Sequence, residues 1–302
     1  MHHFRRIRLV GVLLAVAASV SPAQNSSAPP VRTLRVNGVV LSYREQGKGT
    51  PAVFIHGAVG DLRFWEPQRA AFSRGHRFVS YSLRYHGTGA WPDSTREYSV
   101  AAHVADLVAL VRALNAGPVH LVGLSYGGTI AAVMAAEHPE LVRSVVLAEP
   151  GLFHLMVDLP EGQKVMEEVV GAFAAFAQPI QAGDHMQAVR LLTDWVSGST
   201  GAYDRLPADL RQILKDNART LPLVVASPPM PEFNCASLKT IKAPALVLTG
   251  ANSPRQFSLT NERVVACLPG SRAAVIPDAG HVMSYDNARA FNETVLGFIA
   301  GK

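Results

Sequence analysis

Short apolar runs rich in β-branched residues alternate with helix-like segments along most of this chain, and no other feature restricts the fold as much. Chains that alternate in this way fold as a mostly parallel sheet with helices on both faces. One such segment, residues 100–114, has helical spacing, and Gly117-Pro118 is expected to end it. The strand-like runs are residues 33–36, 39–43, 52–55, 78–82, 119–124, 144–148, 245–249 and 273–276. The sequence therefore predicts an α/β fold with a mostly parallel eight-stranded sheet.

The alternation stops between residues 151 and 238. This stretch contains three helix-like segments separated by Pro and Gly clusters, at residues 164–176, 186–195 and 207–218, and a Pro-rich strap at 227–231. We interpret residues 151–238 as a helical cap inserted between a first core part, residues 31–150, and a second, residues 239–302. The Phe and Met residues of the cap either line a pocket or pack between its helices.

The first 23 residues have the three regions of a secretory signal peptide. Arg5, Arg6 and Arg8 precede an apolar run at residues 9–20, and Ser21-Pro22-Ala23 supplies small residues before a cleavage point. The apolar run is shorter than the roughly 20 residues that a membrane-spanning helix needs. We therefore expect residues 1–23 to be removed and the mature protein to be secreted or periplasmic, without a membrane segment.

Charge excludes nucleic acid as a partner. Without the three leader arginines, the 28 basic residues of the chain fall to 25, against 23 acidic ones, and no run of Lys or Arg remains. Nucleic-acid binding then lacks its electrostatic basis. A composition with 48% hydrophobic and 17% charged residues is typical of a globular protein.

Cysteine and histidine spacing gives no sign of a metal site. The chain has two cysteines, Cys235 and Cys267, for which the sequence favours two separate buried thiols and leaves a disulfide open. The eleven histidines are scattered, and Gly47-Lys48-Gly49-Thr50 lacks the spacing of a phosphate-binding loop. We expect no metal and no cofactor.

The strongest local signal is Gly123-Leu124-Ser125-Tyr126-Gly127-Gly128. It follows a predicted strand and precedes a predicted helix at residues 129–137, which is the context of the G-x-S-x-G nucleophile elbow. The glycines allow a sharp turn and a close approach of helix and strand, so that Ser125 Oγ is held above the sheet. The alternative is a plain tight turn.

From these motifs the chain resembles the α/β-hydrolase superfamily over residues 31–151 and from residue 239 onwards. The loop Phe54-Ile55-His56-Gly57-Ala58 resembles the family's oxyanion loop, which implies that the backbone N–H groups of Ala58 and Tyr126 face the developing oxyanion. His56 is expected to brace that loop. Asp278-Ala279-Gly280-His281 resembles the family's final Gly-His motif, which makes His281 the candidate base.

The acid departs from the commonest family pattern. Many members have Asp three residues after the Gly that ends the seventh strand, where this chain has Ser253. Some branches instead place an acid at the end of the sixth strand, a position that Glu149 occupies here. The order Ser125, Glu149, His281 matches the superfamily, and Asp278 is the main rival for the acid.

The resemblance implies a cofactor-independent serine hydrolase that cleaves a carboxylic ester or lactone through an acyl-Ser125 intermediate. A Ser nucleophile argues against epoxide-hydrolase and haloalkane-dehalogenase chemistry, which needs a carboxylate nucleophile. Hydrolysis of amides or of carbon–carbon bonds in β-diketone-like compounds, peracid formation, and a non-catalytic ligand-binding role on the same fold stay open. We expect a small substrate of apolar character and assign no substrate-binding residue or oligomeric state. Residues 84–86 and Trp91 either shape the pocket mouth or brace the sheet edge.

Overall fold

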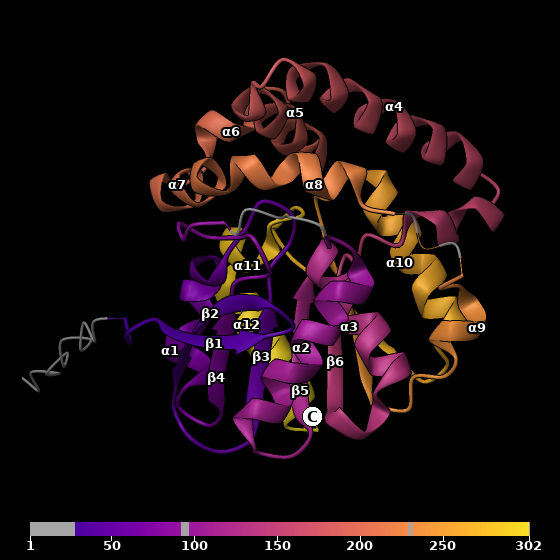
Figure 1. Cartoon of the computed structure of the whole chain (residues 1–302). Helices are drawn as coiled ribbons and strands as arrows, with labels where there is room; N and C mark the ends of the chain where they lie inside the picture. The colour runs from indigo at the N-terminus through magenta and orange to yellow at the C-terminus, as the bar shows by residue number, and fades with distance from the viewer. Residues whose placement is uncertain (1–27, 92–96, 229, 231, 302) are drawn as a thin grey trace, which may run out of the picture.

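The fold is built around one mixed sheet (Figure 1). The computed structural model describes residues 28–91, 97–228, 230 and 232–301. The eight strands of the sheet have the order β1-β2-β4-β3-β5-β6-β7-β8. The pairs β1–β2 and β2–β4 are antiparallel, and all other pairs are parallel. The strands are β1 (Arg32–Val36), β2 (Val39–Gln46), β3 (Pro51–Ile55), β4 (Arg77–Tyr81), β5 (Val119–Leu124), β6 (Val142–Ala148), β7 (Ala245–Gly250) and β8 (Arg272–Ile276). The predicted α/β fold is confirmed, and each strand-like run of the sequence is a strand. The proposed signal peptide, residues 1–23, lies outside the described residues.

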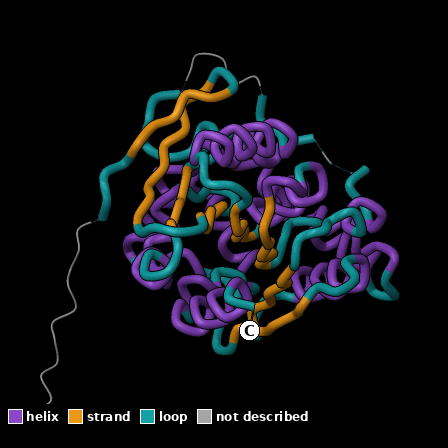
Figure 2. The backbone as a smooth tube through the Cα atoms, turned by 90° about the horizontal axis from the view of Figure 1, so that it is seen from below, coloured by secondary structure: helices purple, strands orange, loops and turns teal. Residues whose placement is uncertain are grey.

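Helices cover both faces of the sheet, as the view along it shows (Figure 2). Along β6, Val145 and Leu147 belong to one hydrophobic cluster and Val146 and Ala148 to another, because successive side chains of a strand point to opposite faces. The first cluster is closed by α2 (Val100–Leu114), α3 (Tyr126–Glu137), α9 (Cys235–Leu238) and α10 (Arg255–Cys267). The second is closed by η1 (Leu62–Trp65), α1 (Glu66–Phe72), α11 (Met283–Asp286) and α12 (Ala288–Ile299).

Helix α2 has the predicted bounds but not the predicted stop. Ser99 caps its first turn by accepting a hydrogen bond from the Ala102 N–H at 3.1 Å. At the other end Asn115 takes the left-handed conformation, with φ 47°, before Gly117-Pro118 is reached. Asn tolerates this conformation better than most residues, so it ends the helix two residues earlier.

The segment between β6 and β7 is helical, as the sequence predicts. Its helices α4 to α8, which we call the cap helices, lie over the carboxyl ends of the parallel strands (Figure 1). The α9 helix instead packs against α10 and α3. The elements are η3 (Phe153–Asp158), α4 (Gly162–Gln181), α5 (His185–Ser197), α6 (Ala202–Arg205), α7 (Ala208–Asn217), η4 (Ala218–Thr220), α8 (Leu221–Ala226) and α9; η2 (Pro139–Leu141) precedes β6.

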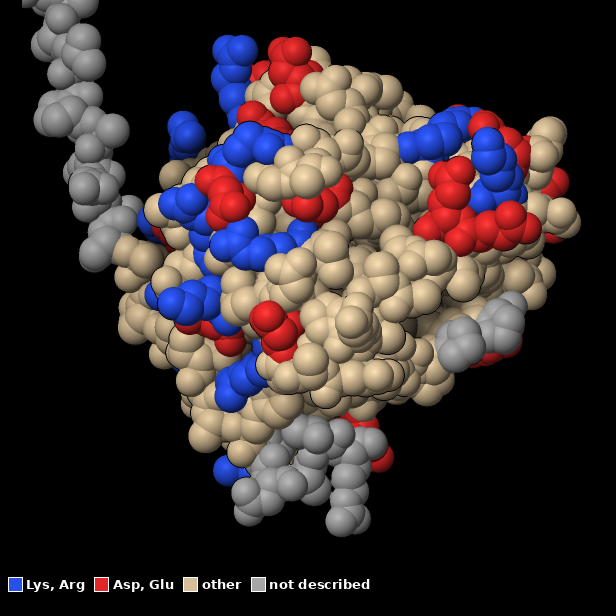
Figure 3. Space-filling model, turned by 90° about the horizontal axis from the view of Figure 1, so that it is seen from above, with Lys and Arg blue, Asp and Glu red and all other residues tan. Residues whose placement is uncertain are grey.

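Charged residues on the face above the cap helices are of mixed sign (Figure 3). Arg255 at the start of α10 pairs with Glu161 and Glu262, and Arg190 of α5 pairs with Asp204. Opposite charges that lie this close cancel much of one another's field. Within the described ranges, no helix has the length and apolar character to cross a bilayer.

A disulfide joins Cys235, the first residue of α9, to Cys267, the last residue of α10. The expectation of two separate thiols is therefore wrong. The two residues are 32 positions apart, and their Cα atoms lie 4.9 Å apart because α9 packs on α10. The sequence could not show this distance, since it arises from the packing of two helices, one before and one after β7 in the chain, against each other.

We expect the disulfide to stabilise the fold by about 4 kcal/mol, because it closes a loop of some thirty residues in the unfolded chain. Urea unfolding of the Cys235→Ala, Cys267→Ala double variant should show this loss relative to the oxidised protein. Each single variant should lose a similar amount, because either substitution removes the bridge. Recovery of the native protein with two titratable thiols would contradict the bridge.

Candidate active site

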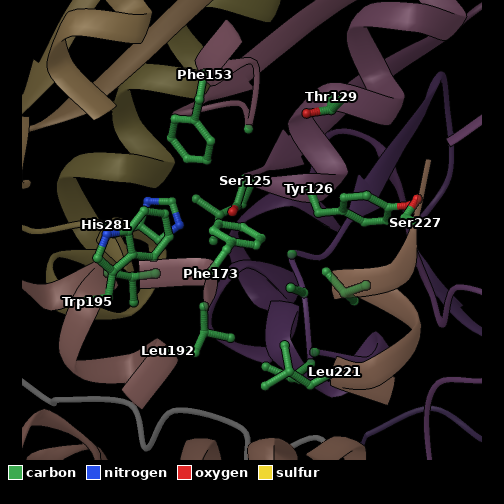
Figure 4. Close-up of a pocket in the computed structure, with 18 of the residues that line it drawn as sticks. Ser125, Tyr126, Thr129, Phe153, Phe173, Leu192, Trp195, Leu221, Ser227 and His281 are labelled. Carbon is green, nitrogen blue, oxygen red and sulfur yellow. The ribbon is translucent and has the colours of Figure 1, made fainter. Parts of the chain in front are cut away.

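Ser125 lies at the sharp turn between β5 and α3. Its φ of 54° and ψ of −120° are strained for a residue with a side chain. The turn is possible because its neighbours are glycines: a Cβ on Gly123 would overlap the Gly127 carbonyl, and a Cβ on Gly127 would overlap the Ile55 carbonyl. The Ser125 side chain is thereby presented to a cavity under the cap helices (Figure 4).

Glu149 and His281 are joined by a short hydrogen bond. Glu149 directly follows β6, is fully buried and has φ 44°. Its Oε1 accepts the Gly250 N–H at 2.8 Å, and its Oε2 lies 2.6 Å from His281 Nδ1. Because Nδ1 is occupied by the carboxylate, Nε2 is the nitrogen available to the cavity. His281 follows β8, so 132 residues of sequence separate the pair.

Phe257 of α10 stacks on the imidazole of His281, with the ring centroids 3.9 Å apart and the planes at 17°. This contact and the bond to Glu149 fix the ring from its face and from its edge. Ser125 and His281 line the same cavity (Figure 4), without a hydrogen bond between them. Such bonds are often long until substrate binds.

Neither Asp278, the rival acid, nor Ser253, at the family's usual acid position, is hydrogen-bonded to His281. Asp278 is exposed, in a left-handed turn with φ 53°. The Ser253 hydroxyl is buried without a hydrogen-bond partner. Of the three positions that the sequence considers for the acid, Glu149, Ser253 and Asp278, the one whose side chain bonds the His281 imidazole is Glu149.

The sequence did not single out Asp286, which holds the loop of His281. Its carboxylate accepts the Gly280 N–H at 2.9 Å. Burial raises the pKa of Asp286, and the neighbouring Glu149 acts in the same direction, whereas His281 and the Gly280 N–H lower it. The only signal in the sequence was an acid shortly after the Gly-His motif.

His56 braces the loop after β3, as expected. It is fully buried, and its Nε2 accepts the Leu83 N–H at 3.0 Å. Its Nδ1 must then carry the proton and donate to the Gly57 carbonyl, 2.8 Å away. Because that carbonyl and the Ala58 N–H belong to one peptide plane, the bond directs the Ala58 N–H the opposite way. Ala58 and Tyr126 both line the cavity.

Residues 84–86 and Trp91 do not line this cavity. Arg84 forms a buried ion pair with Asp106 at 2.7 Å. His86 bonds the Gly60 carbonyl at 2.7 Å and the Tyr98 hydroxyl at 3.0 Å. Of the two interpretations, bracing of the loops at the sheet edge is therefore the one that the contacts support for Arg84 and His86.

The cavity has a volume of about 470 Å³, a size typical of small-molecule sites. Most of its wall is apolar and comes from the cap segment. Met166, Phe173 and Phe176 are among the lining residues, so several Phe and Met residues of the cap do line a pocket; others are Phe153, Leu192, Trp195, Leu206, Leu210, Leu214, Leu221, Val224 and Met230.

Residues 50–288 match a family model described as the alpha/beta hydrolase fold. A protein of Mycobacterium tuberculosis that carries the name non-heme bromoperoxidase BpoC is 27% identical over 86% of this chain and 97% of its own. The carboxylesterase YbfK of Bacillus subtilis is 25% identical over 82% of this chain and 80% of its own. The solved structure of Est816, described as an N-acyl homoserine lactone degrading enzyme, is similar with a TM-score of 0.70 and 26% identity, covering 88% of this chain and all of that one.

Buried histidines near the site predict a loss of stability in acid. Burial lowers the pKa of His56 to about 4 and of His86 to about 3, against about 6.5 in an unfolded chain. Between these values the unfolded chain binds more protons, so each such group removes up to ~1.4 kcal/mol per pH unit as the pH falls. Urea unfolding should show stability declining from about pH 6.5 towards pH 4. A free energy of unfolding that stays constant across this window would contradict the neutral, buried state of both rings.

Proposed function

The chain belongs to the α/β-hydrolase family and is an enzyme of the ester-hydrolase type, and we propose that it opens carboxylic esters or lactones through an acyl-enzyme on Ser125. The observation that carries the proposal is the buried Glu149–His281 pair, which leaves Nε2 free at the cavity that Ser125 also lines. A carboxylate–imidazole pair beside a serine held on a strained turn is the arrangement that acyl transfer requires.

In the proposed acylation step, Ser125 Oγ attacks the carbonyl carbon while His281 Nε2 takes the hydroxyl proton. The imidazolium that forms is stabilised by the Glu149 carboxylate at 2.6 Å and by the Phe257 ring face. The bond from the carbonyl carbon to the leaving oxygen then breaks, and His281 returns its proton to that oxygen. The acyl group stays on Ser125.

The negative oxygen of each tetrahedral intermediate would be bound by the N–H groups of Ala58 and Tyr126. His56 supports this role by holding the Gly57 carbonyl away from the cavity. Fixed donors of this kind contribute about 2.7–4 kcal/mol each to acyl transfer. In deacylation a water takes the place of Ser125 Oγ, with His281 again accepting and returning the proton.

Esters and lactones are both within the proposal. The carbonyl chemistry is the same; a lactone differs because its leaving oxygen stays attached to the acyl group. YbfK, a carboxylesterase by name, supports esters, and Est816, described as degrading N-acyl homoserine lactones, supports lactones.

The proposal includes export of the enzyme, for which the leader at residues 1–23 and the disulfide are the supporting features, since disulfides persist in oxidising compartments. Mass spectrometry of protein from the native host should find a mature N-terminus near Gln24 outside the cytoplasm. Accumulation of the intact Met1 form in the cytoplasm would contradict export.

An activated Ser125 should react with a fluorophosphonate probe. We expect one covalent adduct on the wild-type protein and none on Ser125→Ala, because the elbow exposes a hydroxyl that His281 can deprotonate. Peptide mass mapping identifies the modified residue, and Ser253→Ala is the control, since that hydroxyl lies outside the cavity lining. A folded wild-type protein that never reacts would favour a ligand-binding role.

Removal of the Glu149 charge should reduce kcat by on the order of 10⁴-fold without unfolding the protein. The amide of Glu149→Gln cannot stabilise the imidazolium and favours the wrong imidazole tautomer, as in other serine triads. Asp278→Asn and Ser253→Ala are matched controls on the two rival positions, and each should cost far less. Near-full activity of Glu149→Gln together with an inactive Asp278→Asn would overturn the assignment.

A further inference from the structure

The Thr129 hydroxyl is a buried polar group that the hydrolytic steps above do not use. Thr129 is 5% exposed, and its Oγ1 has no hydrogen-bond partner. It lines the same cavity as Ser125, and Figure 4 shows its oxygen directed into the space between Phe153 and Ser125. Since a buried hydroxyl is normally paired, an unpaired one at a ligand cavity points to a ligand partner.

The helix explains why this hydroxyl is free. A threonine inside a helix usually bonds the carbonyl four residues earlier. Thr193 of α5 and Thr260 of α10 do so, each at 2.7 Å, to Val189 and Gln256. For Thr129 that carbonyl belongs to Ser125, which already accepts the N–H groups of Thr129 and Gly151.

The position of Thr129 restricts where a bound polar group lies. Ser125 is the residue that precedes α3, and Thr129 lies one turn into that helix, so the two side chains are neighbours on the cavity wall. A group that bonds Thr129 Oγ1 therefore lies within a few covalent bonds of a carbonyl carbon at Ser125. Phe173 and Leu192 of the cap helices leave apolar space for the rest of the molecule (Figure 4).

The charge of the wall restricts the ligand further. Among the described residues that line the cavity there is no Lys, Arg, Asp or Glu. Its two histidines already have partners, since His154 Nε2 bonds the Phe233 carbonyl and His281 Nδ1 bonds Glu149. A carboxylate or ammonium group of a substrate would lose its hydration there without gaining a partner of opposite charge. The mixed charges on the face above the cap helices provide no single-sign field to draw in an ion (Figure 3).

A second polar point on the wall is less open to a ligand. The Tyr126 and Ser227 hydroxyls lie beside one another, short of hydrogen-bond geometry (Figure 4). Burial raises the pKa of Tyr126 to about 12, and the Ser227 hydroxyl acts in the opposite direction. A small rotation pairs these two hydroxyls, whereas Thr129 has no such neighbour.

We propose that Thr129 is a specificity-determining residue that selects uncharged substrates with a hydrogen-bonding group, such as a hydroxyl or carbonyl, at the β carbon of the acyl chain. This inference rests on the proposed function and specifies its substrate class. The remainder of the acyl chain is apolar and lies against the cap helices.

Phenyl esters of hexanoic acid and β-hydroxyhexanoic acid test the inference, with kcat/KM measured for each. The wild type should prefer the hydroxy ester by about tenfold, the effect of one hydrogen bond in a site that excludes water. Thr129→Val, which keeps the shape and removes the hydroxyl, should abolish the preference. Thr129→Ser should retain it. Thr193→Val is the matched control, because Thr193 lines the same cavity but its hydroxyl is already bonded within α5, and the preference should persist in it.

A charged pair of substrates tests the second half of the inference. The phenyl half-ester of adipic acid, an anion, should be cleaved with a kcat/KM at least tenfold below that of its neutral methyl ester. Equal rates within this pair, or a Thr129→Val variant that affects hexanoate and hydroxyhexanoate esters equally, would overturn the inference while leaving the hydrolase intact. Cleavage of no ester by a wild-type protein that a fluorophosphonate also fails to label would overturn the proposed function with it.

Discussion

The bond between Glu149 and His281 is the interaction on which the candidate site depends. A fully buried carboxylate is costly unless it is hydrogen-bonded. Here the Gly250 N–H and the His281 imidazole both donate hydrogen bonds to Glu149. The bond ties the end of β6 to the loop after β8, across the end of β7. It also sets which ring nitrogen faces the cavity, so the chemistry of the imidazole follows from a structural contact.

The sheet supplies the rigidity that this arrangement needs. The Ser125 N–H donates to the Ala148 carbonyl and the Glu149 N–H to the Leu248 carbonyl, so that the ladder continues past the ends of β5 and β6. Ser125 and Glu149 both have a left-handed φ, which costs roughly 1–3 kcal/mol each. Buried strands packed on both faces offset that cost, and the two side chains are thereby held at adjacent strand ends, beneath the cap helices.

Much of this could be predicted from local sequence. The strands have continuous apolar runs, and the elbow is a contiguous motif, so neither needs knowledge of distant contacts. The family resemblance then indicated Glu149, His281 and the bracing role of His56. Features that depend on packing between distant segments were not predictable: the disulfide between α9 and α10, the stacking of Phe257 on His281, and the bond from Asp286 to Gly280. The unpaired hydroxyl of Thr129 was also not predictable, because a threonine in a helix normally bonds a backbone carbonyl of that helix.

The hydrogen bond at His281 Nδ1 tests the central claim most directly. In protein labelled with ¹⁵N at histidine, NMR should show a strongly hydrogen-bonded Nδ1–H resonance of His281 that disappears in Glu149→Gln. The same resonance should persist in Asp278→Asn. Absence of this resonance from the wild type, or an Nδ1–H signal unchanged by Glu149→Gln, would contradict the account.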